Sequence, residues 1–202
     1  MFITFEGIDG SGKSTQARRL ADHLRAAGRH VRLTREPGGS AGAEEIRRLL
    51  VEGEPNRWSA ETEILLFTAA RRDHVERLIR PALDAGEMVV CDRFADSTRI
   101  YQGATRGDLR GLVDSLHTQM IGLEPDLTFI IDLDPQAAFA RLSERAGDEG
   151  RFEAFGLEFQ RNLRAGFQGL AQAAPDRCRI IDGNRSADEI AAEVLAAVGV
   201  NV

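Results

Sequence analysis

The fold is decided by the stretch Gly7-Ile8-Asp9-Gly10-Ser11-Gly12-Lys13-Ser14. It fits the pattern G-x-x-x-x-G-K-[ST], in which glycines let successive backbone N–H groups point into one anion-sized hollow. Lys13 would bring a positive charge to the β- and γ-phosphates, and the Ser14 hydroxyl could ligate Mg²⁺. The pattern therefore predicts a nucleoside triphosphate site, with contacts from Gly7, Ile8, Asp9, Gly10, Ser11, Gly12, Lys13, Ser14 and Thr15.

The segments on either side of this loop show the periodicities of a strand and of a helix. The apolar run Phe2-Ile3-Thr4-Phe5 precedes the loop. After the loop, apolar residues recur at the i, i+3, i+4 and i+7 spacing of an amphipathic helix, namely Ala17, Leu20, Ala21, Leu24 and Ala27. The N-terminus of that helix would face the phosphates. This context favours a true phosphate loop over a Gly/Ser-rich turn without a ligand.

Four further apolar runs alternate with helical patterns along the chain. They cover residues 31–34, 88–92, 127–133 and 178–182. Strands that are buried on both faces have continuous apolar runs of this kind, and strands that alternate with helices form parallel sheets. We therefore expect an α/β fold with a doubly wound, five-stranded parallel sheet, formed by residues 1–202 as a single domain.

Capping signals predict where three of the helices start. Ser59 is followed by a long helical pattern, and Pro81 within that pattern predicts a kink or a restart. Asp134 and Pro135 suit the cap and the first position of the helix after the fourth strand. Residues 186–189 form a capping box that would open the last helix.

Composition and charge narrow the choice of partners and of compartment. The formal net charge of −6 argues against nucleic acid as a partner, because such a chain repels a polyanion outside a local basic patch. Cys91 and Cys178 lie in separate apolar segments, so we expect both to be reduced and buried. Met1 leads directly into the first strand, and the longest apolar stretch is too short for a membrane span. We therefore expect a cytoplasmic protein with no membrane contact.

The end of the third strand carries a second pair of candidate residues. Asp92 and Arg93 follow an apolar run, at the carboxyl edge where open α/β sheets bind ligands. Asp92 could hold the metal and its water shell, and Arg93 could grip a second phosphorylated molecule. Asp132 also ends an apolar strand, but the sequence Asp-Leu-Asp-Pro more simply prepares a helix start.

Three segments of this chain resemble bacterial thymidylate kinases: FEGIDGSGKSTQ at residues 5–16, REPGG at 35–39 and DRFADSTRIYQG at 92–103. The resemblance implies the P-loop nucleoside-monophosphate kinase fold with a short helical lid. It also implies the reaction ATP + dTMP → ADP + dTDP with Mg²⁺, and a homodimer. Two alternatives are a kinase for another nucleoside monophosphate and a P-loop switch protein. A switch GTPase would need an Asn-Lys-x-Asp element, which this sequence does not contain.

The resemblance also implies roles for residues on the dTMP side. Pro37 and Phe67 would sandwich thymine, and Arg71 would reach a thymine carbonyl. Tyr101 would lie against the deoxyribose, and Arg93 would hold the dTMP phosphate. The full set of dTMP contacts expected in this way is Asp9, Pro37, Phe67, Arg71, Arg93, Ser97, Thr98, Tyr101 and Gln102.

The segment of residues 141–155 is the expected lid. Phosphoryl transfer develops charge that an arginine on a closing lid can stabilise. The phosphate loop offers no arginine, so this role would fall on Arg151 or Arg145, beside Lys13 and Arg93 as the other catalytic cations. Where the family's lid often has Asp-Arg-aromatic-Glu, this chain has Gly150-Arg151-Phe152-Glu153. Arg141 and Arg185 could flank adenine.

Overall fold

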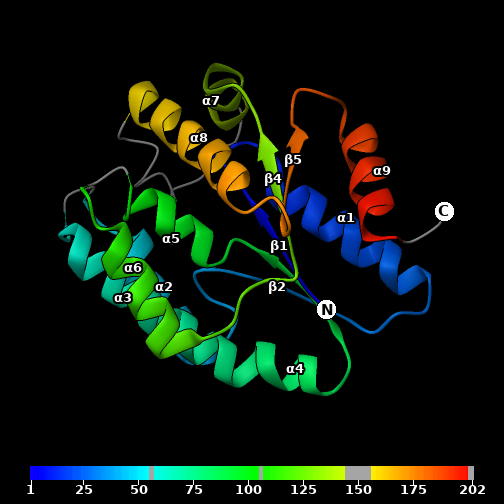
Figure 1. Ribbon diagram of the computed structural model, residues 1–202, viewed down its shortest axis with the longest axis horizontal. Coiled ribbons are helices and arrows are strands. Elements are labelled where there is room, and N and C mark those ends of the chain that lie inside the picture. The colour runs from blue at the N-terminus through cyan, green and yellow to red at the C-terminus, as the bar shows by residue number, and fades with distance from the viewer. Residues whose placement is uncertain (55–56, 105–106, 144–155, 200–202) are drawn as a thin grey trace.

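In this computed structural model, residues 1–54, 57–104, 107–143 and 156–199 are described. They form one five-stranded sheet in which every pair of neighbouring strands is parallel, with the order β2-β3-β1-β4-β5 (Figure 1). The strands are β1 (Phe2–Glu6), β2 (Val31–Arg35), β3 (Met88–Asp92), β4 (Leu127–Asp132) and β5 (Cys178–Asp182). All five predicted strands are present, so the predicted α/β fold is confirmed.

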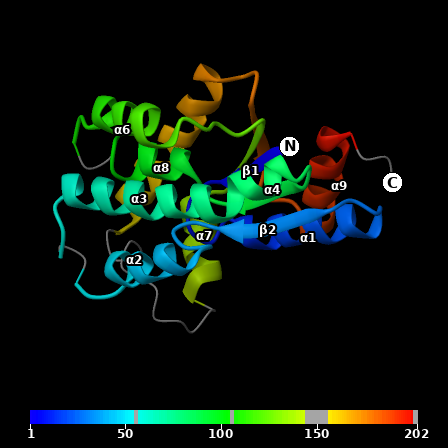
Figure 2. The same cartoon turned by 90° about the horizontal axis from the view of Figure 1, so that it is seen from below.

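Helices connect the strands and cover both faces of the sheet. They are α1 (Lys13–Ala26), α2 (Ala41–Val51), α3 (Ala60–His74), η1 (Val75–Ile79), α4 (Arg80–Asp84), α5 (Ala95–Tyr101), α6 (Arg110–Leu116), η2 (His117–Ile121), α7 (Pro135–Ser143), α8 (Gly156–Ala173) and α9 (Ala187–Val198). Figure 2 shows α2 and α3 side by side, past the carboxyl end of β2.

The two faces of the sheet bury alternate residues of the same strands. Ile3 and Phe5 of β1 pack with α1 and α9 on one face. On the other face, Phe2 of β1 packs with η1 and α4, while Ile130 of β4 packs with α8. Because successive strand residues point to opposite faces, the continuous apolar runs supply two cores at once.

The capping predictions agree with the observed helix starts. The Ser59 side chain accepts a hydrogen bond from the backbone N–H of Thr62, and Ser186 and Glu189 form the complete capping box. Asp134 Oδ1 accepts from the backbone of Gln136 at 2.8 Å. These contacts satisfy N–H groups that lack a partner within the helix.

The helical run after Ser59 changes geometry before Pro81. It passes from α3 into the five-residue π-helix η1 and resumes as α4, whose first turn contains Pro81. A proline ring clashes with the carbonyl four residues earlier, and a wider π turn relieves that contact. A kink or a restart was expected here, and the structure shows a change of helix type, with Val75 and Arg80 at the junctions still in the right-handed helical region.

Both cysteines are free and buried, as expected. Within the described ranges, no helix combines the length and the apolar character needed to cross a bilayer.

Candidate active site

A cavity of about 380 Å³ opens at the carboxyl edge of the sheet. Its walls come from the loops that follow β1, β2 and β3, together with α2, α3 and α5. β1 lies between β3 and β4, so the chain turns to opposite sides of β1 as the sheet is built. Ligands of open α/β sheets bind at such a switch point because the neighbouring loops diverge there.

The phosphate loop curls over the end of β1 and into α1. Gly7 has φ +134°, and a Cβ there would lie 2.6 Å from the Ile131 carbonyl oxygen, so no other residue fits without rearrangement. The Lys13 ammonium donates to the Ile8 carbonyl at 2.6 Å. Burial, and then the positive charge of Arg93, lower the pKa of Lys13 to about 8. A bound anion would favour the charged form of this lysine.

Ser14 and Asp92 meet beside Lys13. The Ser14 hydroxyl donates to Asp92 Oδ2. The other carboxylate oxygen, Oδ1, is buried without a hydrogen-bond partner among the described residues. Hydroxyl and carboxylate oxygens suit Mg²⁺, so this pair fits the metal expected from the sequence. Asp132 is the other aspartate that ends an apolar strand. Both of its oxygens accept hydrogen bonds from the Arg164 guanidinium of α8, at 2.7 and 2.8 Å, so both already have a partner.

Arg93 turns back from the end of β3 toward the phosphate loop. Its φ of +69° places its backbone in the left-handed region, which is uncommon for a residue with a side chain. The guanidinium pairs with Asp9, and it donates to Ser97 Oγ at 2.9 Å and to the Tyr101 hydroxyl at 3.2 Å. Burial opposes the charge on Arg93, but Tyr101 and Asp9 outweigh burial and raise the pKa of Arg93. Arg93 therefore remains a cation.

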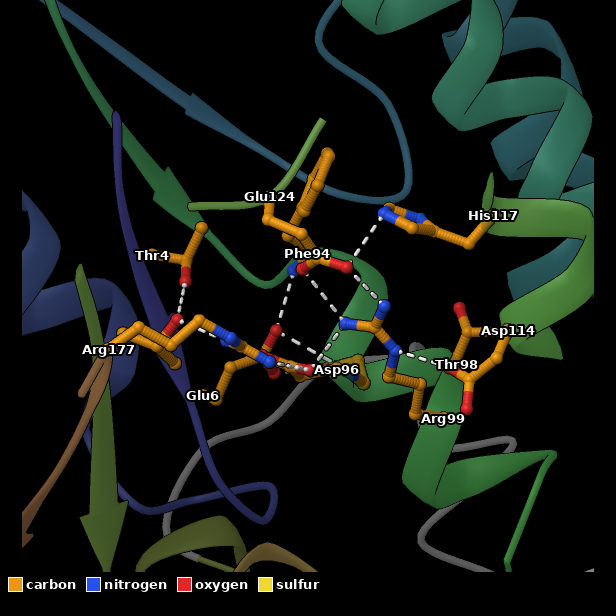
Figure 3. Close-up of polar contacts among 12 residues, drawn as sticks. Thr4, Glu6, Phe94, Asp96, Thr98, Arg99, Asp114, His117, Glu124 and Arg177 are labelled. Atoms are coloured by element: carbon orange, nitrogen blue, oxygen red, sulfur yellow. Dashed lines mark hydrogen bonds and ion pairs between the residues drawn. The ribbon is translucent and has the colours of Figure 1, made fainter. Parts of the chain in front are cut away.

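Glu6 at the end of β1 holds the turn that aims Arg93. Its carboxylate accepts from the Phe94 backbone at 2.8 Å, and from the Ser97 backbone and hydroxyl at 3.3 and 2.6 Å. Burial, and then the nearby Asp96 carboxylate, raise the pKa of Glu6 to about 7. Figure 3 shows the Asp96 carboxylate between the guanidinium groups of Arg99 and Arg177. Glu6 was not predicted from the sequence, because its partners lie about 90 residues further along the chain.

Asp9 and Tyr101 close the side of the cavity next to Arg93. The Tyr101 hydroxyl donates to Asp9 Oδ2 at 3.0 Å. Burial acts to raise the pKa of Asp9, but the charges of Arg93 and Lys13 outweigh it, and the net pKa is lowered. Asp9 is therefore an anion held between two cations, and it can accept a hydrogen bond from a hydroxyl group in the cavity.

Arg71, Pro37 and Phe67 line the same cavity. Only 3% of the Arg71 side chain is exposed. Its Nε donates to Glu36 Oε2 at 2.7 Å, and its Nη2 donates to Thr98 Oγ1 at 3.0 Å. An apolar slot with a few fixed polar groups is the usual form of a site for a planar ligand.

Comparison with known proteins identifies the family of this chain. The sequence model described as thymidylate kinase matches residues 5–194. The chain is 71% identical to the thymidylate kinase of Dinoroseobacter shibae, with 96% of this chain and 94% of the relative covered.

The chain belongs to the thymidylate kinase family.

Further relatives agree with this assignment. The thymidylate kinase of Ruegeria pomeroyi is 68% identical over 96% of this chain and 92% of its own length. The crystal structure of thymidylate kinase from Ehrlichia chaffeensis is 38% identical, covers 98% of both chains and has a TM-score of 0.79. The family resemblance and the P-loop nucleoside-monophosphate kinase fold expected from it are therefore confirmed. The chain is an ATP-dependent nucleoside-monophosphate kinase, and its acceptor is dTMP.

The structure brings all nine residues predicted for the dTMP side to one cavity. These are Asp9, Pro37, Phe67, Arg71, Arg93, Ser97, Thr98, Tyr101 and Gln102. Gly10, Gly12, Lys13, Ser14, Thr15 and Asp92 line the same cavity. Their roles in binding remain predictions, but their proximity is what those predictions require.

Other predicted residues lie apart from the cavity wall. Gly7, Ile8 and Ser11 belong to the phosphate loop but do not line the cavity. Arg141 of α7 donates to the Gly183 carbonyl at 3.3 Å, and Arg185 pairs with Glu193. Arg145 and Arg151 lie outside the described residues, as does most of the expected lid.

Several cavity residues were not selected from the sequence. Glu36 lines the cavity and is buried against Arg71, and Arg47 of α2 donates to the Pro37 carbonyl at 2.7 Å. Phe94 lies under the Arg71 guanidinium, whose carbon is 5.2 Å from the ring centroid. A sequence signal existed for Glu36, which lies within the REPGG segment, and for Phe94, which lies within the DRFADSTRIYQG segment, but none existed for Arg47.

Proposed function

We propose that this cavity transfers the γ-phosphoryl group of ATP to dTMP, giving ADP and dTDP. The proposal is carried by one observation: two cations, Lys13 of the phosphate loop and Arg93 after β3, line the same cavity with Asp9 close to both. Two phosphorylated molecules can therefore meet there, one on each cation. A protein that only binds a nucleoside triphosphate needs no second buried cation beside the lysine of its phosphate loop.

The transfer needs positioning and charge compensation and requires no covalent intermediate. Lys13 contacts the β- and γ-phosphates, where negative charge develops on the oxygens. Arg93 holds the dTMP phosphate in line with the transferred group, and its raised pKa keeps it charged throughout. The positive φ of Arg93 and its bonds to Asp9 and Ser97 fix its direction before the substrates arrive. Preorganised cations of this kind act without the reorganisation that water would need.

Ser14 and Asp92 would hold Mg²⁺, with the remaining ligands supplied by phosphates and water. The unpartnered Oδ1 of Asp92 supports this assignment. When bound, the ion neutralises charge on the phosphate oxygens of ATP.

A second group of cavity residues recognises the nucleoside of dTMP. Pro37 and Phe67 offer flat apolar surfaces for thymine, and Arg71 donates to a thymine carbonyl. Ser97, Thr98 and Gln102 complete the polar edge of the base site, and all three line the cavity. Tyr101 lies against the deoxyribose, where an added 2′-hydroxyl would crowd it. Asp9 accepts a hydrogen bond from the 3′-hydroxyl or from a water bound to it.

We assign the remaining transition-state charge to an arginine of residues 141–155, with Arg151 first and Arg145 second. The phosphate loop contains no arginine, so this cation has to come from elsewhere in the chain. Arg141 and Arg185 flank the adenine of ATP. The hydrogen bond from Arg141 to Gly183 supports this pairing, because it brings α7 next to the turn that carries Arg185.

We propose further that residues 1–202 form one kinase domain that works as a cytoplasmic homodimer, with small-molecule substrates and no nucleic-acid partner. Large apolar side chains on three helices support pairing with a second copy: Leu65 of α3 is 58% exposed, Met120 of η2 is 47% exposed and Leu112 of α6 is 40% exposed. Sedimentation or light scattering would report whether the particle has the mass of one chain or of two.

The two free, buried cysteines suit a reducing compartment, which supports the cytoplasmic location.

A coupled assay of ADP release across the common monophosphates tests the function. We expect dTMP to exceed dCMP and dGMP in kcat/KM by orders of magnitude. A buried donor or acceptor that is left unpaired by the wrong base costs about 1–3 kcal/mol per group. Comparable efficiency on all acceptors would contradict the thymine assignment and would favour a kinase of broader acceptor range.

A further inference from the structure

A chain of buried polar contacts runs from β2 to the base side of the cavity. Thr34 Oγ1 lies 2.8 Å from His74 Nε2, and His74 Nδ1 lies 3.1 Å from Glu36 Oε1. The other Glu36 oxygen, Oε2, accepts from Arg71 Nε at 2.7 Å. The side chains of Arg71, Glu36 and His74 are only 3%, 4% and 0% exposed, so water does not compete for these contacts.

The chemistry of the groups sets the direction of the hydrogen bonds made to Glu36. Glu36 faces the Arg71 guanidinium, and an ionised carboxylate can only accept. His74 must therefore carry a proton on Nδ1 and donate it to Glu36. At its other ring nitrogen, Nε2, His74 meets the Thr34 hydroxyl, which can either donate or accept. The Glu36 carboxylate is held from two sides, by His74 and by Arg71.

This arrangement determines which part of Arg71 is left for a ligand. Nε is used by Glu36, and Nη2 donates to the Phe94 carbonyl at 3.2 Å and to Thr98 Oγ1 at 3.0 Å. Within the described parts of the chain, Nη1 is the guanidinium nitrogen for which no hydrogen bond is seen, and Arg71 lines the cavity. Because a guanidinium is planar and rigid, fixing two of its nitrogens also fixes the direction of the third.

We propose that Glu36 and His74 are positioning residues that set the base selectivity of the acceptor site by fixing the direction of Arg71 Nη1. The inference rests on the proposed function, in which thymine lies against Arg71. Neither residue has to touch the substrate. Glu36 acts through Arg71, and His74 acts through Glu36.

The link between a fixed donor and base selectivity follows from the edges of the pyrimidines. Thymine presents the acceptor O4, whereas cytosine presents an amino donor at the same position. A donor that cannot turn away from an amino group is left unpaired against it, and this penalty excludes cytosine. An arginine that was free to swing could avoid the mismatch. Loosening Arg71 should therefore harm dTMP more than dCMP.

Steady-state kinetics of Glu36→Gln on dTMP, dCMP and ATP test this inference. The amide offers Arg71 a single neutral acceptor oxygen in place of a charged carboxylate, so the guanidinium is held more weakly. We expect KM for dTMP to rise about tenfold to a hundredfold, kcat and KM for ATP to stay near wild type, and the ratio of kcat/KM for dTMP over dCMP to fall by at least tenfold. Thr4→Val is the control, because it removes a buried hydroxyl contact, to Thr128, in which neither Arg71 nor Glu36 takes part. It should leave the ratio unchanged.

A pair of substitutions at His74 decides the question if Glu36→Gln does not fold. In His74→Asn, the amide nitrogen can take the place of Nδ1 and still donate to Glu36, whereas His74→Leu removes both contacts. His74→Leu should lower the ratio of kcat/KM for dTMP over dCMP. His74→Asn should keep most of the wild-type ratio.

An unchanged ratio in Glu36→Gln, or equal ratios in the two His74 variants, would overturn the inference. A wild-type enzyme that uses dTMP and dCMP equally well would instead refute the proposed function, so the two failures are distinguishable.

Discussion

Replacing Gly39 with alanine tests how tightly the segment after β2 packs against α3. Gly39 has φ +92°, and a Cβ at this position would lie 2.3 Å from His74 Nε2 and 2.6 Å from Thr34 Oγ1. Alanine therefore meets two costs: the left-handed backbone costs about 1–2 kcal/mol, and the forced displacement of buried groups costs about 1–3 kcal/mol. Together they should lower the free energy of unfolding of Gly39→Ala by about 2–5 kcal/mol.

Gly86→Ala separates the two costs. Gly86 has φ +78°, but a Cβ there would meet nothing within 4 Å, so this variant carries only the backbone cost. The difference between the variants, about 1–3 kcal/mol, corresponds to about 2–12 °C in Tm for a chain of this length. Thermal unfolding followed by circular dichroism measures it. Equal losses of Tm in both variants would refute the packing argument.

The same substitution should also affect activity. Displacing His74 loosens the contact between Glu36 and Arg71, so KM for dTMP should rise in Gly39→Ala and stay unchanged in Gly86→Ala. A Gly39→Ala enzyme with lower Tm but wild-type KM would mean that the clash is relieved by moving a different group, such as Thr34.

Three further predictions concern the charges around the reaction. Lys13→Ala should lower kcat by orders of magnitude with little change in Tm, and turnover within a few-fold of wild type would exclude its role on the phosphates. Arg151→Ala should lower kcat by about 10³-fold or more while dTMP affinity stays near wild type. A large effect of Arg145→Ala alone would assign the stabilisation of transition-state charge to Arg145. If neither substitution lowers kcat, neither arginine has this role. The pKa of Glu6 is raised from its ordinary value of 4.5 to about 7 in the folded protein, so the protonated side chain stabilises the fold. This stabilisation is fully present below pH 4.5 and is lost as the pH rises through about 7. Urea unfolding across this range should show a loss of stability that Glu6→Gln lacks, and parallel pH profiles for the two proteins would contradict the shift.

Much of the fold could be predicted because the signals are local. The phosphate loop, the apolar strands and the caps at Ser59 and Ser186 depend on residues within a few positions of one another, and all appear at the predicted places. Even the change of helix geometry before Pro81 follows from the missing N–H and the ring of one residue. The family resemblance then indicated acceptor-site residues, such as Tyr101, that the helix and strand periodicity of the sequence does not single out.

The tertiary structure decided what distant side chains do to one another. Asp92 and Asp132 both end apolar strands, and only the packing of α8 shows that Asp132 is bound to Arg164 while Asp92 keeps an oxygen without a partner. Glu6 and Glu36 look alike in the sequence. In the structure one carboxylate orders the turn of Arg93 and the other orders Arg71, because their partners lie between 35 and 91 residues away. Local rules determine which elements form, whereas the direction of a buried charge depends on which groups the assembled sheet and helices place around it.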